Sequence, residues 1–585
     1  MRFVLPVVAA LLPVVIAPGL LFYFDVTPKL VILLIGLSAA LILWRGELPL
    51  DSRRNRTFLL LLGAQAISLV VSTVASVAPA LSLNGSNWRR FGLVSQIAVL
   101  LFAMLVAAEC AADRDRVTLY LKAIVVGGIP VALYAILQYF GWDPWLPKQS
   151  YHAGEATWSI VRPPSTMGHA GYLATYLLFV VFAAAALIRA RTWRLPAGLS
   201  AALASTAILM SGTRAAMLGL LAGAALLVFL TSRLLGFLTS LAAIVLVSVL
   251  YFSPAGQGLR NRVNWVSNEP LGGARPLLWR DSLRMSLHHP ALGYGPETFI
   301  REFPPQESLD LARAYPDFLH ESPHDIFLDA LIAQGIPGLL VLVAFCAWGL
   351  WQKSADPCIK GALVAALVAQ VFTAFILPTC LFFYLTLALL IQPGPLRSIP
   401  LARIAGWCCA LLLTVYALRW SVADSYLASA SAALDRGDLA RAIVAHRQVL
   451  KWALPGSSSD LYYSRRLVDL VGKSTDFRFK AQGIREAANA AILATRNSED
   501  PPNAWYNLAA FLSITSSPAD VERSLRESIR AAPHWYKPHW VLAQLLVAER
   551  RLDEARREAE IAVECNQNEP ELINTLEKIR AAQRQ

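Results

Sequence analysis

Long apolar runs alternate with short polar loops over the first 420 residues of the sequence. A helix that crosses a bilayer needs about 20 mostly apolar residues, and about 12–13 segments meet or approach this length. They lie near residues 3–24, 29–44, 57–77, 93–112, 117–139, 169–188, 196–212, 215–231, 234–252, 335–352, 360–377, 379–393 and 402–420. The pattern predicts an all-α, polytopic membrane protein, with residues 1–420 as its transmembrane domain.

Residues 421–585 lack such runs and are rich in Arg, Glu, Ala and Leu. Within them, three positions recur at a spacing of 34 residues: first Leu508, Ala509 and Leu512, then Leu542, Ala543 and Leu546. A helix–turn–helix unit of this period resembles a tetratricopeptide repeat. We therefore predict a C-terminal soluble α-helical repeat domain, whose curved surface would bind a protein partner or mediate dimerisation. A plain helical bundle with chance periodicity is the alternative.

The Lys and Arg residues of the short loops gather on one side of the predicted transmembrane domain. Arg45, Arg53 and Arg114 are examples from loops on the side of the N-terminus. Because cytoplasmic loops carry the excess of Lys and Arg, the N-terminus is predicted to be cytoplasmic. An odd number of spans then places the C-terminal domain on the periplasmic face of a bacterial inner membrane. The long polar insertions at 140–168 and 253–334 are predicted on the same face.

The composition narrows the function classes. The 585-residue chain is 56% hydrophobic and 16% charged, which is too apolar for a soluble enzyme. A net charge of +12 is typical of nucleic-acid-binding proteins. Here many basic residues lie between apolar segments, so membrane topology explains the charge and no nucleic-acid partner is expected. The seven cysteines form no spaced ligand motif, so neither a disulfide framework nor a zinc site is expected.

One cation lies in an unusual place for a transmembrane domain. Arg214 belongs to SGTRAAMLG, a tight turn between two apolar segments on the predicted periplasmic face. Such a turn needs Gly and Thr but does not need Arg. A guanidinium group binds phosphate oxygens through a planar fork of donors, so Arg214 is a candidate phosphate ligand. Snorkelling of Arg214 towards lipid headgroups is the alternative.

The longer insertion carries most of the other candidate residues. RPLLWRDSLRMSLHH predicts an amphipathic helix with Arg275, Arg280 and Arg284 as its basic positions. A second helix is predicted after His320 and His324, and it runs to a Gly-Ile-Pro-Gly sequence where a membrane span begins. Because histidine transfers protons near neutral pH, His324 is a candidate for taking a proton from an acceptor hydroxyl. The alternative is a helix N-terminal residue bonded to the backbone.

Three motifs follow one another along the chain: SGTRAAMLGLLAG, LLWRDSLRMSLHHPALGYGPETF and HDIFLDALIAQGIPG. Together they resemble the O-antigen ligase and polymerase superfamily, which includes bacterial O-oligosaccharyltransferases. The last motif resembles that family's His, polar residue, nine-residue spacer and Gly-x-x-Gly, here His324, Asp325, Gly335 and Gly338. Asp325 departs from the Asn, Ser or Gln that is usual at its position. The stretch RPPSTMGHAGYLATYL at 162–177 also resembles a segment of the family.

The resemblance implies a helical membrane glycosyltransferase of the GT-C type. Such an enzyme moves a glycan from undecaprenyl diphosphate to an acceptor hydroxyl on the periplasmic face. By this resemblance Arg214 and Arg280 would bind the diphosphate and stabilise the charge of the leaving group, and His324 would orient or deprotonate the acceptor. These three are the predicted catalytic residues. Further substrate contacts are predicted from Arg162, Arg275, Arg284 and His320.

The resemblance also implies a metal-independent reaction without a cofactor. The first predicted periplasmic loop contains one acidic residue, Asp25, whereas metal-dependent GT-C enzymes usually carry an acidic pair there. The acceptor stays open among a lipid A core sugar, a polysaccharide chain and a protein Ser or Thr. A flippase or transporter of lipid-linked glycans and an assembly scaffold are the alternative functions. Few charges lie inside the predicted helices, which argues against the transporter.

Overall fold

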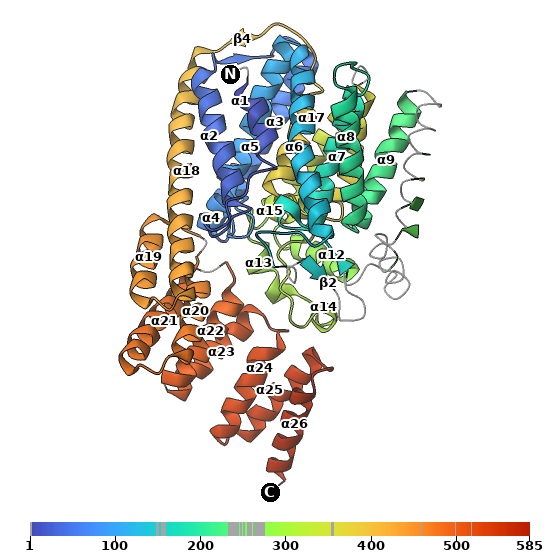
Figure 1. The fold of residues 1–585 in the computed structure, drawn as a ribbon. Helices are drawn as coiled ribbons and strands as arrows, with labels where there is room; N and C mark the ends of the chain where they lie inside the picture. Colours follow the sequence, from blue (N-terminus) through green and yellow to red (C-terminus); the bar gives the residue numbers. More distant parts are fainter. Residues whose placement is uncertain are drawn as a thin grey trace.

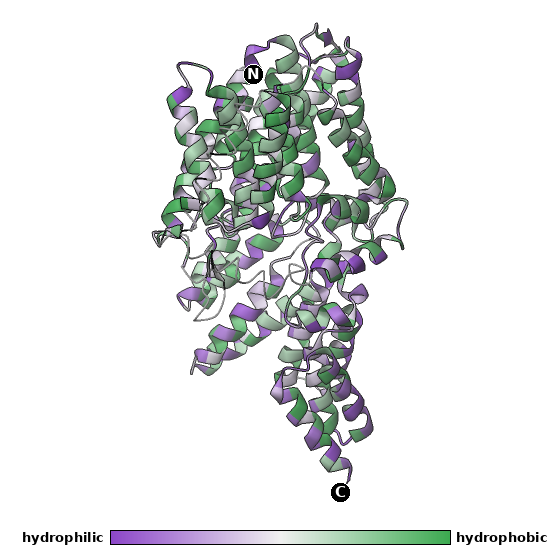
Figure 2. Cartoon of the chain, turned by 90° about the vertical axis from the view of Figure 1, so that its right-hand side faces the viewer, coloured by the Kyte–Doolittle hydropathy of each residue, from purple (hydrophilic) through white to green (hydrophobic). Residues whose placement is uncertain are grey.

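The computed structural model describes residues 3–147, 151–153, 160–231, 275–352, 356–456, 458–497, 499–515 and 517–584, with a few further positions between 241 and 260. It is 74% helical with almost no strands among these residues, which confirms the predicted all-α class. An apolar helical bundle lies at one end of the molecule, and a more polar helical tail lies at the other (Figures 1 and 2).

The bundle contains twelve of the described helices. They are α1 (Val4–Leu11), α2 (Thr27–Leu43), α3 (Arg53–Val74), α5 (Leu93–Ala112), α6 (Asp115–Tyr139), α7 (Ala170–Leu187), α8 (Arg194–Met210), α9 (Arg214–Leu230), α15 (Ile326–Leu350), α16 (Pro357–Gln370), α17 (Leu377–Ala388) and α18 (Pro400–Asp435). Among the described residues, six of them are long and apolar enough to cross a membrane: α3, α5, α6, α7, α15 and α18. Five shorter ones, α2, α8, α9, α16 and α17, are also apolar. The protein is therefore polytopic, and the predicted span near 234–252 lies almost entirely outside the described residues.

The first predicted span, 3–24, is wrong in extent. Helix α1 covers only Val4–Leu11, or about 12 Å at 1.5 Å per residue, which is too short to cross a bilayer. Pro13 follows directly, and Pro18 comes soon after. Because proline lacks a backbone N–H and restricts the residue before it, the helix ends here despite the apolar sequence.

Short elements gather at the end of the bundle that faces the tail. They are α4 (Pro79–Asn84), β2 (His152–Ala153), β3 (Ile160–Val161), the 3₁₀ helices η2 (Ser165–Met167) and η4 (Pro304–Gln306), α12 (Arg275–Ser286), α13 (Phe299–Glu302) and α14 (Leu309–Ala314). Strand β2 pairs antiparallel with β3. At the opposite end of the bundle, β1 (Glu47–Leu48) pairs antiparallel with β4 (Arg397–Ser398). Figure 1 shows α12, α13 and α14 between the bundle and the tail.

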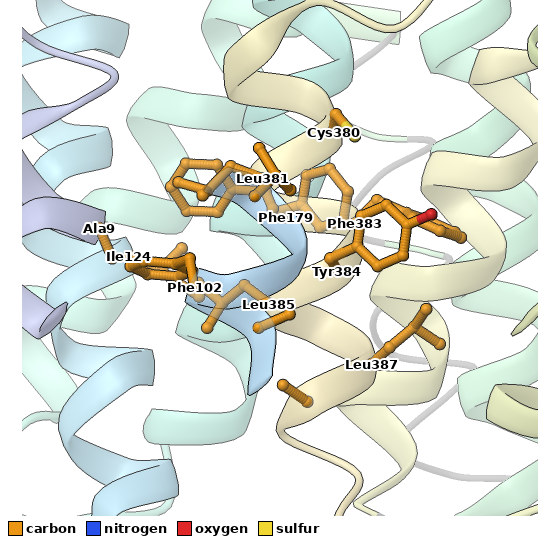
Figure 3. Packing of buried hydrophobic residues seen from close by; sticks show 14 of the residues in the cluster. Ala9, Phe102, Ile124, Phe179, Cys380, Leu381, Phe383, Tyr384, Leu385 and Leu387 are labelled. Carbon is orange, nitrogen blue, oxygen red and sulfur yellow. The ribbon is translucent and has the colours of Figure 1, made fainter. Parts of the chain in front are cut away.

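The centre of the bundle is packed around α17. Its Leu381, Phe383 and Leu385 are all fully buried. Figure 3 shows these side chains close to Phe102 of α5 and Phe179 of α7. Since lipid tails are as apolar as these side chains, close packing between helices, rather than exclusion of water, holds this part together. The packed centre gives the loops at the tail end a fixed base.

The described part of the tail contains eight helices that follow α18. They are α19 (Leu439–Trp452), α20 (Asp460–Lys473), α21 (Phe477–Asn497), α22 (Pro501–Thr515), α23 (Pro518–Ala531), α24 (Tyr536–Ala548), α25 (Leu552–Cys565) and α26 (Pro570–Gln583). Helix α22 packs on α23 and α24 packs on α25. Leu508 lies in α22 and Leu542 in α24, so the 34-residue spacing found in the sequence corresponds to one helix pair.

A single helix joins the bundle to the tail. Helix α18 runs through residue 420 without a break. Its Asp424, which is 1% exposed, accepts hydrogen bonds from Arg90 Nη2 at 2.9 Å and Thr27 Oγ1 at 2.8 Å. The backbone N–H of Tyr23 also donates to Asp424, at 3.1 Å. These contacts fix the orientation of the helix where it leaves the bundle.

Candidate functional site

Two adjoining cavities lie at the end of the bundle that faces the tail. One has a volume of about 350 Å³ and is here called the basic cavity, and the other, of about 490 Å³, is called the mixed cavity. Both are lined by Arg162, His169, Arg275, Phe318, His324, Phe372 and Thr373. The basic cavity adds Arg214, Tyr315 and His320. The mixed cavity adds Asp25, Lys29, Trp88, Arg89, Tyr172 and Glu321.

Three helices, α7, α9 and α15, begin at these cavities, and the described part of α12 starts there. Arg214 is the first residue of α9, and Arg275 is the first described residue of α12. His169 precedes α7, where its Nδ1 accepts a hydrogen bond from the backbone N–H of Gly171 at 3.1 Å. His324 lies directly before the first turn of α15. Because each helix N-terminus carries a partial positive charge, the helix dipoles and the arginines together favour a bound anion.

Arg162, Arg214 and Arg275 come together at the basic cavity. Burial lowers the pKa of Arg162 below its usual value, and the charges of Arg275 and Arg214 lower it further. Burial and then the charge of Arg214 likewise lower the pKa of Arg275. A bound anion would offset this mutual repulsion. Arg162 Nε is buried without a hydrogen-bond partner among the described residues, so a donor is available for such a ligand.

His324 lies where the two cavities meet. Its backbone φ is +53°, and its Nδ1 lies 3.3 Å from the hydroxyl of Ser322, a fully buried residue. Burial lowers the pKa of His324 to about 3, with further contributions from Arg275, His169 and other nearby cations. The ring is therefore neutral at physiological pH. With Nδ1 at the serine, Nε2 is the nitrogen that can accept a proton from a substrate.

Asp325 has a clear structural role. Its Oδ1 accepts hydrogen bonds from the backbone N–H groups of Phe327 at 2.7 Å and Leu328 at 3.1 Å, which caps the N-terminus of α15. Asp thus serves at the position where the resembling family usually has Asn, Ser or Gln. The cap fixes the start of the helix and, with it, the position of the preceding His324.

The last two sequence motifs bind each other through the backbone. The Gly-Ile-Pro-Gly sequence, where a membrane span was predicted to begin, is instead a bend within α15 at Gly335, which has a φ of +68°. A Cβ at Gly335 would lie 2.6 Å from the carbonyl oxygen of Pro290. On the other side of this contact, the N–H of Tyr294 donates to the carbonyl of Ile332 at 2.8 Å. The glycine is therefore required where the loop after α12 meets the bend in α15.

His320 is paired with a buried acid. Its Nε2 lies 3.7 Å from Glu307 Oε1, and both side chains are buried. Burial lowers the pKa of His320 to about 4 and raises the pKa of Glu307 to about 8. Both groups are therefore largely neutral at pH 7. His320 lines the basic cavity as a polar but uncharged group.

Arg280 and Arg284 lie apart from the other predicted residues. Neither is among the described residues that line the two cavities. Arg280 donates to Asp281 Oδ1 at 3.0 Å, to Ser308 Oγ at 2.6 Å and to Asp310 Oδ2 at 3.3 Å. The side chain of Arg284 is 67% exposed. Among the arginines of α12, only Arg275 lines the cavities.

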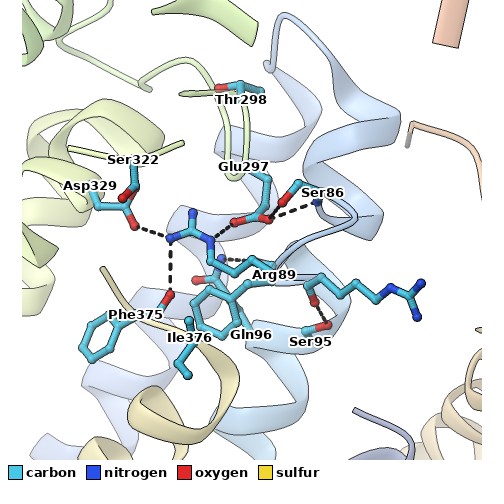
Figure 4. A network of polar contacts seen from close by, with 12 residues as sticks. Ser86, Arg89, Ser95, Gln96, Glu297, Thr298, Ser322, Asp329, Phe375 and Ile376 are labelled. Atoms are coloured by element: carbon cyan, nitrogen blue, oxygen red, sulfur yellow. Dashed lines mark hydrogen bonds and ion pairs between the residues drawn. The ribbon is translucent and has the colours of Figure 1, made fainter. Parts of the chain in front are cut away.

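Arg89 is a cavity residue that the sequence did not single out. Figure 4 shows it between the carboxylates of Glu297 and Asp329, at 2.5 Å and 3.2 Å, and the carbonyl of Phe375 at 3.2 Å. Glu297 also accepts hydrogen bonds from Ser86, so one carboxylate joins the loop after α4 to the loop before α13. Two adjacent arginines in a short loop were the only available signal in the sequence.

Asp25 and Lys29 line the mixed cavity too. Lys29 Nζ donates to the backbone carbonyl of Thr166 at 2.6 Å and to that of Asp25. Asp25 thus lies in the cavity beside a cation. Across the described residues, no group of three or more His, Cys, Asp or Glu side chains is arranged to hold a metal ion.

The fold and the cavities define a multi-pass membrane protein whose site suits an anionic substrate. Residues 199–343 match the family model described as O-antigen ligase. The matched range contains Arg214, Arg275, His320 and His324, whereas Arg162 precedes it. A search of curated proteins found no match. The family match supports the superfamily predicted from the motifs and indicates a glycosyltransferase-type enzyme that uses a lipid-linked glycan donor.

Proposed function

We propose that the protein is a metal-independent glycosyltransferase of the bacterial inner membrane. It moves a glycan from undecaprenyl diphosphate to an acceptor hydroxyl on the periplasmic face. The observation that carries this proposal is the meeting of three arginines, three helix N-termini and a neutral histidine at one pair of cavities. The O-antigen ligase match over residues 199–343 supports the reaction class.

The diphosphate of the donor binds in the basic cavity. Arg162, Arg214 and Arg275 supply charged donors for its oxygens, and the N-terminus of α9 adds its backbone dipole. The lipid chain of undecaprenyl diphosphate lies in the membrane beside the bundle. Since the diphosphate gains negative charge when the glycan leaves, these groups stabilise the transition state more than the bound donor.

The acceptor enters the mixed cavity, which is lined by both acidic and basic side chains. Asp25 and Glu321 offer carboxylate oxygens to hydroxyl groups, and the aromatic rings of Trp88 and Tyr172 offer flat apolar faces. His324 borders both cavities, so it lies between donor and acceptor. A lipid A core sugar, a growing polysaccharide and a protein Ser or Thr are the three candidate acceptors.

Transfer makes one bond and breaks one. The acceptor oxygen attacks the anomeric carbon of the glycan, and the bond from that carbon to the diphosphate oxygen breaks. The acceptor proton goes to His324 Nε2 and from there to the released diphosphate, which has gained a negative charge. His324 is a weak base in the empty site, but the charge of a bound diphosphate offsets that of the neighbouring arginines and raises its pKa.

Arg280 has a different role in this proposal from the one its motif suggested. It joins α12 to the loop before α14 through Ser308 and Asp310, and it supports the position of α12. Residues 1–420 form the transmembrane domain in this proposal. Residues 421–585 form a tetratricopeptide-like domain on the periplasmic face, where the concave side of the helix pairs binds a protein partner.

Transfer from a purified undecaprenyl-diphosphate glycan in nanodiscs, with EDTA present, tests the proposal. Parallel reactions offer lipid A core, polysaccharide and peptide acceptors to wild type, His324→Ala and His324→Gln. We expect transfer in EDTA and its loss in both His324→Ala and His324→Gln, whereas appreciable activity in His324→Gln would show that the ring only positions the acceptor. No transfer by a folded protein that still binds the donor would favour a flippase or a scaffold instead.

A further inference from the structure

The tail contacts the segment that leads into the part of the cavity wall formed by Tyr315, Phe318 and His320. His534 Nδ1, in the turn before α24, lies 2.6 Å from the carbonyl oxygen of Glu307 and therefore donates to it. Lys537 Nζ lies 2.6 Å from Asp317 Oδ1, and the hydroxyl of Tyr536 donates to the same carboxylate at 3.1 Å. The tail thus holds both ends of the stretch from residue 307 to residue 317.

Helix α25 adds a third contact to the same stretch. Arg313 Nε donates to the carbonyl of Glu564 at 2.8 Å, and its guanidinium lies 3.4 Å from the Glu564 carboxylate. Leu309 packs against an apolar cluster of the tail that includes Tyr536 and Cys565. An apolar contact surrounded by polar ones is the usual composition of a specific protein interface. Figure 1 shows α14, which lies in this stretch, next to the tail helices.

The other side of this stretch faces the cavities. Tyr315 and Phe318 lie on either side of Asp317 and line the basic cavity, and His320 follows. The ring centroids of Phe318 and His320 are 5.1 Å apart, in an edge-to-face contact. A displacement of Asp317 therefore reaches the cavity wall through its own chain neighbours. His324 is four residues beyond His320 and follows Pro323, whose carbonyl accepts a hydrogen bond from Trp279 Nε1 at 3.0 Å.

From these contacts we propose that the C-terminal tail is a positioning element of the active site. Its helices α24 and α25 hold residues 307–317 in place, so that Tyr315, Phe318 and His320 form a preshaped wall for the donor. The binding of the donor in the cavities rests on the proposed function, whereas the contact between the tail and residues 307–317 does not depend on it. It assigns the tail a second task besides partner binding, and one that needs no partner.

Reversing the charge of Lys537 alone, and then those of Lys537 and Asp317 together, tests the proposal in the full-length protein. In Lys537→Asp, two carboxylates meet, and we expect faster amide hydrogen exchange over residues 309–320. Because misplacing a substrate-binding wall by about 1 Å can cost about 100-fold, we expect a 10- to 100-fold lower kcat/KM for glycan transfer. The double variant Lys537→Asp with Asp317→Lys restores the opposite charges and should recover most of the loss. Arg441→Asp reverses an exposed tail charge on α19, far from this contact, and serves as the control.

Four results are decisive. Unchanged exchange and unchanged transfer in Lys537→Asp would overturn the proposal, and so would failure of the double variant to recover either. An equal loss in Arg441→Asp would show general damage to the tail rather than loss of this contact. Amide hydrogen exchange could become faster in Lys537→Asp and recover in the double variant while wild type transfers glycan to no acceptor. In that case the positioning role holds and the proposed function fails.

Discussion

Removal of one arginine from α12 is the sharpest test of the site. Arg275 lines both cavities, so Arg275→Ala removes a charged donor from the diphosphate site. Loss of one preorganised donor at a developing charge costs about 10²–10³ in turnover. Arg162 and Arg214 remain, and the charge of Arg214 already lowers the pKa of Arg275, so relief of repulsion offsets part of the loss. We therefore expect about a 100-fold lower kcat/KM for the donor, equivalent to about 2.7 kcal/mol.

The same helix supplies the control. Arg284 is 67% exposed and its Nη1 lies 3.9 Å from Asp281, a contact of the kind that contributes about 0–1 kcal/mol. Arg284→Ala should change kcat/KM by less than about twofold. Initial rates would be measured over a range of undecaprenyl-diphosphate glycan in nanodiscs, with thermal unfolding to confirm that each variant folds. Equal effects of the two substitutions would refute the assignment. Loss of transfer in Arg280→Ala, with Arg275→Ala active, would instead favour the role that the motif suggested for Arg280.

Three further predictions concern the surroundings of the cavities. Because burial and nearby cations lower the pKa of His324 to about 3, its ring stays neutral in the free enzyme. The kcat/KM should then be flat from about pH 8 down to about pH 5, and a fall centred near pH 6.5 would contradict this. Glu297→Ala removes one of the two acidic partners of the buried Arg89. It should lower the free energy of unfolding by about 3–5 kcal/mol, which would be measured as a lower Tm. Glu297→Gln should lower Tm less. Gly293→Ala, at a φ of +70° and with a new Cβ 2.5 Å from the carbonyl oxygen of Ile332, should also lower Tm, and an unchanged Tm would argue against this backbone contact.

The amphipathic pattern of α12 showed that a helix forms but not which residues face the site. Along an α-helix each residue turns by about 100°, so Arg280 lies about 140° and Arg284 about 180° around the axis from Arg275. The three arginines therefore cannot share one face. The sequence grouped them as basic positions, and only the packing of α12 on α15 decides that Arg275 is the one at the cavities.

Local patterns were reliable for helices and unreliable for contacts between loops. Apolar runs predicted most bundle helices because helical hydrogen bonds join residues four apart. Arg89 was missed because its partners Glu297 and Asp329 are 208 and 240 residues away in the sequence. Asp25 was considered only as a single acid where metal-dependent enzymes carry a pair, and its place in the mixed cavity depends on the early end of α1. His324 and Arg214 were found because the motifs around them carry information beyond local structure.

Because α18 is one unbroken helix, the number of residues in it determines the direction in which the tail leaves the bundle. At 1.5 Å per residue its 36 residues extend about 54 Å, well beyond a hydrocarbon core of about 30 Å. With Asp424 fixed to the bundle, one residue inserted between Asp424 and the end of α18 would rotate the whole tail by about 100° and withdraw Lys537 from Asp317. Seven inserted residues would return the tail to nearly the same direction but about 10 Å further out. The length of this one helix therefore sets both the direction and the reach of everything that follows it.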